Sequence, residues 1–309
     1  MTDYARLIDE ETWAFIRETE TYYPPDAVTL SVEEQRAVYD RMCRAFHQGY
    51  PEGVRVEDVS AEGVPCRLYE TGTPDVTVVY YHGGGFVVGG LESHDDVCAE
   101  ICDRTGYRVV SVDYRLAPEH AHPAPFDDAR TATLWAASRW PGPLVLAGDS
   151  AGGNLAAAVS HAARSDGPKI VGQVLIYPAL GGDHTKGSYV THAQAPMLTV
   201  TDMEFYQTIR TKGAPPPTDD PTYMPMHDTD FSNLPPTVCI TAECDPLSSD
   251  GGAYRDVIRA AGGRAEWIED AGLVHGHLRA RATVTRAARS FDRIVDAIDA
   301  LGRGDWPYA

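Results

Sequence analysis

One stretch in the middle of the chain, residues 144–154, restricts the fold more than any other feature. It begins with three apolar residues, continues through Gly148-Asp149-Ser150-Ala151-Gly152 and ends in an alanine-rich segment. A strand, a Gly-x-Ser-x-Gly turn and a helix in this order form a nucleophile elbow, in which the serine occupies a strained turn between small residues. On the pentapeptide alone, a glycine-rich turn with an incidental serine stays open as the alternative.

A second glycine-rich block, His82-Gly83-Gly84-Gly85-Phe86, directly follows an apolar run that predicts a buried strand. Consecutive glycines let the backbone approach a bound molecule and present unhindered N–H donors. We therefore expect the N–H groups of Gly84 and Gly85, together with that of Ala151, to form an oxyanion hole. A phosphate-binding loop uses similar glycines, but it would continue into Gly-Lys-Ser/Thr, which does not follow here.

A nucleophilic serine needs a histidine that takes its proton and a carboxylate that orients the histidine. After such an elbow the acid precedes the histidine in the chain, and it follows a late strand. The apolar run 237–242 supplies that strand, and Asp245 comes just after it. Glu243 is still close to the strand, and Asp250 is expected to begin the next helix. Asp245 is therefore the expected acid.

The histidine should follow the next strand, predicted over residues 264–268. Two histidines stand in the loop beyond it, in Leu273-Val274-His275-Gly276-His277. Either His275 or His277 satisfies this requirement, and the residues alone do not choose between them.

The remaining sequence predicts one continuous α/β domain behind an N-terminal helical segment. Residues 1–50 show apolar residues at four-residue spacings, which indicate helices interrupted at Pro24-Pro25. From residue 51 to 309, short apolar runs alternate with amphipathic stretches, which is typical of a mostly parallel sheet flanked by helices. A proline-rich insertion near 185–225 is a candidate lid, and residues 278–301 predict a last helix.

Charge and composition limit the classes of partner that the protein is expected to bind. The net charge of −19 disfavours nucleic acid and anionic membranes, and no apolar run is long enough to cross a bilayer. No secretory signal is evident at the N-terminus. The six cysteines lack the spacing of a disulfide framework, so a reducing cytoplasm is the expected location. His94, Cys98 and Cys102 could seed a metal site, but no fourth ligand is near, and we expect neither metal nor cofactor.

These motifs resemble those of the hormone-sensitive-lipase-like (family IV) microbial carboxylesterases, which carry His-Gly-Gly-Gly and Gly-Asp-Ser-Ala-Gly-Gly blocks. The likeness covers about residues 50–300 and includes Asp113-Tyr114-Arg115 and Asp245-Pro246-Leu247. It implies an α/β-hydrolase fold, a helical cap from residues 1–50, a small-molecule ester substrate and, as a family trait, a homodimer. It also implies Ser150, Asp245 and His275 as the catalytic triad.

One position departs from the family pattern: His277 stands where the family has Phe. We expect His277, Phe86 and Met197 to line the substrate pocket, and the Asp113-Tyr114-Arg115 block to hold the oxyanion loop and elbow in place.

The function expected from the resemblance is hydrolysis of short- to medium-chain acyl esters through an acyl-enzyme on Ser150. Acyl transfer or amide cleavage by the same triad is the first alternative. A ligand-binding receptor without catalysis is the second, and the presence of Ser150, Asp245 and His275 together argues against it.

Overall fold

A single eight-stranded sheet forms the centre of the molecule. The computed structural model describes residues 2–24, 26–165 and 167–308, and the strands lie in the order β1-β2-β4-β3-β5-β6-β7-β8. Strands β1 to β4 are Arg55–Ala61, Val64–Glu70, Thr77–Tyr81 and Arg108–Val112, and β5 to β8 are Leu144–Asp149, Ile170–Ile176, Thr237–Cys244 and Ala265–Val274. All neighbours from β4 to β8 pair in parallel, whereas β1 and β2 are antiparallel.

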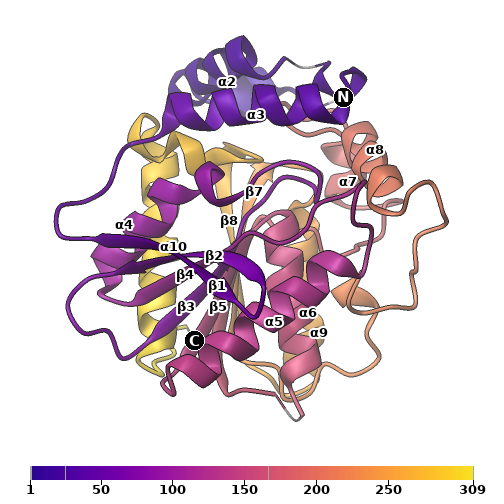
Figure 1. The fold of residues 1–309 in the computed structure, drawn as a ribbon. Coiled ribbons are helices and arrows are strands. Elements are labelled where there is room, and N and C mark those ends of the chain that lie inside the picture. The colour runs from indigo at the N-terminus through magenta and orange to yellow at the C-terminus, as the bar shows by residue number, and fades with distance from the viewer. Residues whose placement is uncertain (1, 25, 166, 309) are drawn as a thin grey trace.

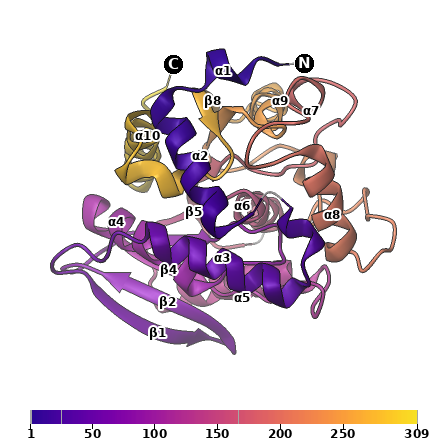
Figure 2. The same cartoon turned by 90° about the horizontal axis from the view of Figure 1, so that it is seen from above.

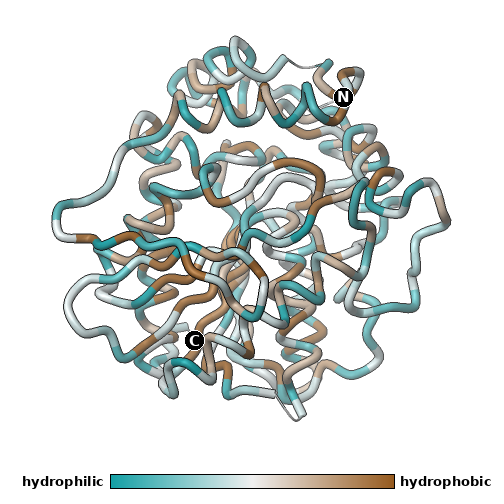
Figure 3. The backbone as a smooth tube through the Cα atoms, viewed as in Figure 1, coloured by the Kyte–Doolittle hydropathy of each residue, from teal (hydrophilic) through white to brown (hydrophobic). Residues whose placement is uncertain are grey.

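Helices cover both faces of this sheet. On one face lie α4 (Asp95–Thr105) and α10 (Thr285–Gly302); on the other lie α5 (Ala124–Arg139), α6 (Ala151–Ala163) and α9 (Ser248–Ala260) (Figure 1). Two buried apolar clusters fill the spaces between the helices and the sheet. The apolar colouring follows the central strands, while the outer turns of the helices are hydrophilic (Figure 3). This arrangement confirms the α/β fold that the sequence predicts.

Several boundaries differ from the sequence-based expectation. The last helix is not continuous from residue 278, because the short 3-10 helix η4 (His277–Ala282) precedes α10. The sequence analysis did not predict α5, whose segment begins His122-Pro123-Ala124-Pro125. A proline in the first turn of a helix lacks only an N–H that would have no intrahelical partner, so these prolines are compatible with the start of α5.

Three N-terminal helices lie above the carboxyl ends of the strands: α1 (Tyr4–Leu7), α2 (Glu10–Tyr22) and α3 (Val32–Phe46) (Figure 2). A capping box between Ser31 and Glu34 starts α3, and the rings of Phe15 and Phe46 join α2 to α3 with centroids 5.3 Å apart. Pro25 of the expected helix break lies outside the described residues.

The predicted insertion contributes two helices beside this layer, α7 (Ser188–Thr191) and α8 (Val200–Arg210), with α8 starting at a capping box of Thr199 and Asp202. The other 3-10 turns are η1 (Ala27–Thr29), η2 (Leu91–Ser93) and η3 (Pro225–His227).

The order of the strands decides where the site lies. Strands β3, β5, β7 and β8 end at Tyr81, Asp149, Cys244 and Val274, and the next residues are His82, Ser150, Asp245 and His275. Because parallel strands end at the same edge of a sheet, four chemically important residues from distant parts of the chain meet there.

Candidate active site

Ser150, His275 and Asp245 form one hydrogen-bonded chain. The Nδ1 atom of His275 lies 2.7 Å from Oδ2 of Asp245, and its Nε2 atom lies 2.9 Å from Oγ of Ser150. A carboxylate only accepts hydrogen bonds, so Nδ1–H donates to Asp245 and Nε2 is the acceptor for the serine hydroxyl. The structure thus brings together the three residues that the sequence analysis selected, in the geometry that proton transfer from Ser150 requires.

The acid of the hydrogen-bonded triad is more deeply buried than its histidine. Asp245 is completely buried, while the His275 side chain retains 14% exposure. Oδ1 of Asp245 also accepts a hydrogen bond from the backbone N–H of Leu247, at 2.9 Å. The carboxylate is therefore held by two donors, whereas the histidine and serine face the cavity described below.

The elbow at Ser150 is strained, as the sequence predicts for such a turn. Ser150 has φ +54° and ψ −115°, a combination that non-glycine residues rarely adopt. Its N–H donates to the carbonyl of Ile176 on β6, at 2.8 Å, which fixes the turn against the neighbouring strand. A Cβ atom on Gly152 would overlap the carbonyl oxygen of Tyr81, so this position admits no side chain.

The two rival acids and the rival base lie elsewhere. Glu243 accepts a hydrogen bond from the N–H of Gly272, and Asp250 accepts from the N–H of Leu180 and the hydroxyl of Tyr189. Burial raises the pKa of Asp250 to about 6, against the opposing effect of these donors. Neither carboxylate is bonded to His275, so geometry favours Asp245.

His277 does not enter the pocket, and the expectation that it lines the pocket is wrong. The residue is 1% exposed and lies in the core, not among the residues around the cavity. Its Nδ1 lies 3.0 Å from the carbonyl of Val274 and its Nε2 lies 2.9 Å from the hydroxyl of Ser290 on α10. The polar ring is accommodated there because both nitrogens have partners, and burial lowers its pKa.

The glycine block lies where oxyanion donors are needed. Gly84 and Gly85 have φ +126° and +61°, and both line the cavity with Ser150 and Ala151. A side chain on Gly84 would overlap the carbonyl of Val88, and a Cβ on Gly85 would lie 2.7 Å from the Tyr206 ring. Within the described residues, the N–H groups of Gly84 and Gly85 donate to no protein acceptor, so both are available to a ligand.

A buried carboxylate that the sequence analysis passed over supports this loop. Asp149, the residue before the nucleophile, accepts hydrogen bonds at 2.9 Å from the N–H of Gly83 and from the hydroxyl of Tyr80. Nε2 of His94 lies 3.2 Å from its other oxygen. Burial alone would raise the pKa of Asp149, but the charge and hydrogen bond of His94, together with the charge of Arg279 and the Tyr80 hydroxyl, hold the pKa below its usual value. The signal was in the sequence: the position between Gly148 and Ser150 holds an acid rather than an apolar residue.

The Asp113-Tyr114-Arg115 block contacts this same region. The Tyr114 hydroxyl donates to the carbonyl of His82 at 2.6 Å, and the two rings stack with centroids 4.3 Å apart. Arg115 binds the carboxylate of Asp128 on α5 through two nitrogens, at 2.7 and 2.8 Å. The Tyr114 contacts hold the start of the glycine block, as expected for this segment, whereas the Arg115 contacts join the segment to α5.

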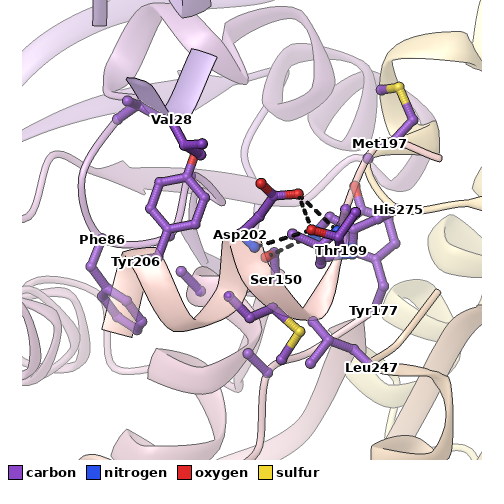
Figure 4. A pocket seen from close by; sticks show the side chains of 18 of the residues that line it. Val28, Phe86, Ser150, Tyr177, Met197, Thr199, Asp202, Tyr206, Leu247 and His275 are labelled. Carbon is purple, nitrogen blue, oxygen red and sulfur yellow. Dashed lines mark hydrogen bonds between the residues drawn. The ribbon is translucent and has the colours of Figure 1, made fainter. Parts of the chain in front are cut away.

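A cavity of about 380 Å³ opens over Ser150. Phe86 and Met197, two of the expected pocket residues, both line it. In Figure 4, Phe86 and Tyr206 lie to one side of Ser150, and Leu247 lies on the other side with Met197. The floor comes from the sheet edge, and the walls come from α3, α8 and the residue that follows α2; they contribute Tyr23, Tyr39, Met42, Met203, Tyr206 and Arg210.

Two further observations concern cofactors and membranes. Among residues 2–24, 26–165 and 167–308, no three His, Cys, Asp or Glu side chains are grouped so that they could hold a metal ion. His94, which the sequence groups with Cys98 and Cys102, contacts Asp149, and both thiols are buried. None of the helices in the described ranges combines the length and apolarity needed to cross a membrane.

Known proteins resemble this chain over most of its length. Residues 78–279 match a family model described as alpha/beta hydrolase fold. Carboxylesterase NlhH of Mycobacterium tuberculosis is 37% identical over 76% of this chain and 77% of its own length. Esterase LipI of the same species is 36% identical over 89% of this chain and 91% of its own length.

A solved structure shows the same fold. The hyperthermophilic esterase from the archaeon Pyrobaculum calidifontis superimposes with a TM-score of 0.85 and 30% identity, covering 96% of this chain and 99% of the esterase.

Proposed function

This chain belongs to the hormone-sensitive-lipase-like branch of the alpha/beta hydrolases and is a carboxylic ester hydrolase, and we propose that it acts through an acyl-enzyme formed on Ser150. The observation that carries this proposal is the hydrogen-bonded chain from Ser150 through His275 to Asp245. These three residues lie beside the free backbone N–H groups of Gly84 and Gly85 at the bottom of the cavity.

Acylation follows from this geometry. As the Ser150 oxygen attacks the ester carbonyl, its proton passes to Nε2 of His275, and the imidazolium that forms is stabilised by the buried Asp245 carboxylate. The negative charge that develops on the carbonyl oxygen is directed to the N–H groups of Gly84, Gly85 and Ala151. The proton on His275 then passes to the departing alcohol, and the acyl group stays on Ser150.

Deacylation reverses these roles with water in place of the alcohol. Water loses a proton to His275 as it attacks the acyl-enzyme, and Ser150 leaves with that proton.

We propose that α1–α3 (residues 1–50) and the insertion near 185–225 form a cap over residues 51–309. The cavity beneath these walls has a volume of about 380 Å³, near the lower end of the range for small-molecule sites, which favours short- to medium-chain acyl groups.

Steady-state and burst kinetics test this function. With 4-nitrophenyl esters of two to twelve acyl carbons, we expect turnover that is greatest for short or medium chains, with a nitrophenolate burst where deacylation is slow. Ser150→Ala should abolish both. A folded wild-type protein that hydrolyses none of these esters would refute the proposal.

A matched pair of histidine variants tests the assignment of the base. His275→Ala should lower kcat by about 10⁴-fold or more, because the serine loses its proton acceptor. His277→Ala should retain far more activity in whatever protein remains folded. The opposite ranking would show that the base is His277.

Acyl transfer by the same site is the second candidate. The acyl-enzyme is common to both reactions, and the choice depends on whether water or another acceptor reaches it. Product analysis with added alcohols separates the two, because transfer yields a new ester and hydrolysis yields only the acid. The homodimer expected from the family resemblance and the cytoplasmic location stay predictions, and sedimentation velocity tests the former.

A further inference from the structure

Two arginines, the buried Arg210 and the partly buried Arg279, line the cavity without a carboxylate partner. Among the carboxylates of the described residues, none lies within 4 Å of the guanidinium of Arg210 or Arg279. Buried arginines outside the cavity behave differently: Arg108 binds Glu70 at 2.7 Å, and Arg281 binds Asp96 and Glu100 at 2.6 and 2.7 Å. Because burying an unpaired charge is costly, two such cations in one cavity require an explanation.

Contacts with the protein explain how the charge of Arg210 can be buried without a carboxylate. Its guanidinium lies between the rings of Phe86 and Tyr223, 3.6 and 3.8 Å from their centroids. It also donates to the carbonyl of Tyr223 at 3.3 Å and lies 3.5 Å from the side-chain oxygen of Asn154. Cation–π contacts on both faces replace part of the lost hydration, so Arg210 shapes the pocket and adds positive charge to it.

Arg279 has fewer partners. One of its terminal nitrogens donates to the Tyr39 hydroxyl, whose ring centroid lies 4.9 Å from the guanidinium carbon, while Nε is buried with no hydrogen-bond partner. A Cβ atom built on Gly276 would lie 3.3 Å from Nη1. The guanidinium therefore lies beside the residue that directly follows His275, and Arg279 lines the same cavity as Ser150 and His275.

The acidic groups around the cavity do not neutralise Arg279. Asp149 is near enough for the two charges to interact, but its oxygens already bind Tyr80, Gly83 and His94. Asp202 caps α8 through Thr199. The third lining carboxylate, on Glu20, belongs to an exposed residue of α2. An anion delivered into the cavity would therefore be the direct partner that Arg279 lacks.

We propose that Arg279 is a specificity-determining residue that binds a carboxylate on the substrate, so that this enzyme prefers esters carrying a negative charge on one half. The inference rests on the proposed function, because it assigns the charge to the ester that Ser150 attacks. A planar guanidinium with unused N–H groups matches a carboxylate, and the partly enclosed site strengthens the pairing relative to water.

Two pairs of esters distinguish which half carries the charge. Mono-4-nitrophenyl glutarate and 4-nitrophenyl pentanoate differ by a carboxylate on the acyl side. The pair 4-acetoxybenzoate and 4-acetoxybenzamide differ by a carboxylate on the alcohol side. We expect kcat/KM of the wild type to be about tenfold or more higher for the anion in at least one pair, and 0.5 M salt to reduce this preference.

Arg279→Gln should lower kcat/KM for the preferred anion by about 10- to 100-fold and change that for its neutral partner less than about threefold. Arg279→Lys should restore part of the difference. The control is Arg41→Gln, which removes one positive charge from the exposed side of α3, outside the cavity, and should leave the preference unchanged.

Binding without turnover gives an independent measurement. The preferred anionic ester should raise the melting temperature of Ser150→Ala more than that of the Ser150→Ala/Arg279→Gln double variant. Equal losses for anionic and neutral esters in Arg279→Gln, or no preference in the wild type, would overturn the inference. Hydrolysis of 4-nitrophenyl pentanoate that depends on Ser150 would leave the proposed function standing in that case, so the two failures are distinguishable.

Discussion

Replacing Gly84 with alanine is the most direct test of the oxyanion loop. The substitution adds one methyl group at a residue with φ +126°, where that group would overlap the carbonyl oxygen of Val88. The backbone must move to relieve this overlap, and the N–H groups of Gly84 and Gly85 move with it. We therefore expect the catalytic effect to come from displaced donors rather than from a changed side chain.

The magnitude follows from two separate costs. Loss of one oxyanion donor typically lowers kcat by about 10²- to 10³-fold, equivalent to about 3–4 kcal/mol of transition-state stabilisation. Holding a non-glycine residue in an unfavourable backbone region costs about 1–3 kcal/mol of folding stability. Gly84→Ala should thus lower kcat by at least 100-fold, with a smaller change in KM and a moderate loss of stability.

Gly63→Ala separates these two costs. Gly63 has φ +96°, but a Cβ atom there would meet nothing within 4 Å, and the residue lies in the turn between β1 and β2. Its substitution should lower the free energy of unfolding by about 1 kcal/mol and change kcat less than twofold. Both variants are compared by urea unfolding and by 4-nitrophenyl butanoate kinetics. If Gly84→Ala kept more than a third of the wild-type kcat, or if Gly63→Ala lost as much activity, the assignment of the donors would be refuted.

Three further substitutions test the buried polar groups. His277→Phe should leave kcat within about threefold but lower the free energy of unfolding by about 1–3 kcal/mol, because the Ser290 hydroxyl loses its partner; a large drop in kcat without destabilisation would contradict this. Asp149→Asn should lower kcat by roughly tenfold, since the amide keeps one acceptor for the Gly83 N–H but loses the charge; unchanged kcat and stability would remove Asp149 from its supporting role. Burial and nearby His94 lower the pKa of His82 to about 4, from 6.5 in the unfolded chain. As the pH falls, the unfolded chain therefore takes up a proton at this histidine before the folded protein does. The contribution of neutral His82 to the free energy of unfolding is complete above about pH 6.5 and is lost as the pH falls to about 4, a change of roughly 3 kcal/mol. Urea unfolding at a series of pH values should show this change in the wild type and not in His82→Asn.

The sequence predicts the fold, and it predicts which residues meet at the candidate site, because both follow from local signals. A short apolar run, a turn of fixed glycine spacing and a helix identify the position of Ser150 without knowledge of any distant contact. The same holds for Asp245, which directly follows an apolar strand. These residues lie at strand ends, and the parallel order of the strands then brings the ends together.

The pocket was less predictable, because its walls come from contacts between distant segments. His277 is only two residues from His275, yet its ring points to Ser290 on α10 rather than into the cavity. No local pattern reveals that direction, since it depends on how η4 packs against the last helix. Arg279 and Arg210 were missed for the same reason: an arginine is ordinary in sequence and becomes informative only when its burial and lack of a carboxylate are known.

The proposed reacting groups directly follow β5, β7 and β8, and this order along the chain has a consequence during synthesis. A chain that has been made only as far as β6 (Ile170–Ile176) contains the oxyanion loop and Ser150, but neither Asp245 nor His275. The hydrogen bond between His275 and Ser150 joins two residues that are 125 positions apart in the sequence. The proposed triad is therefore complete only in a chain made through His275, and we predict that ester cleavage begins after that point.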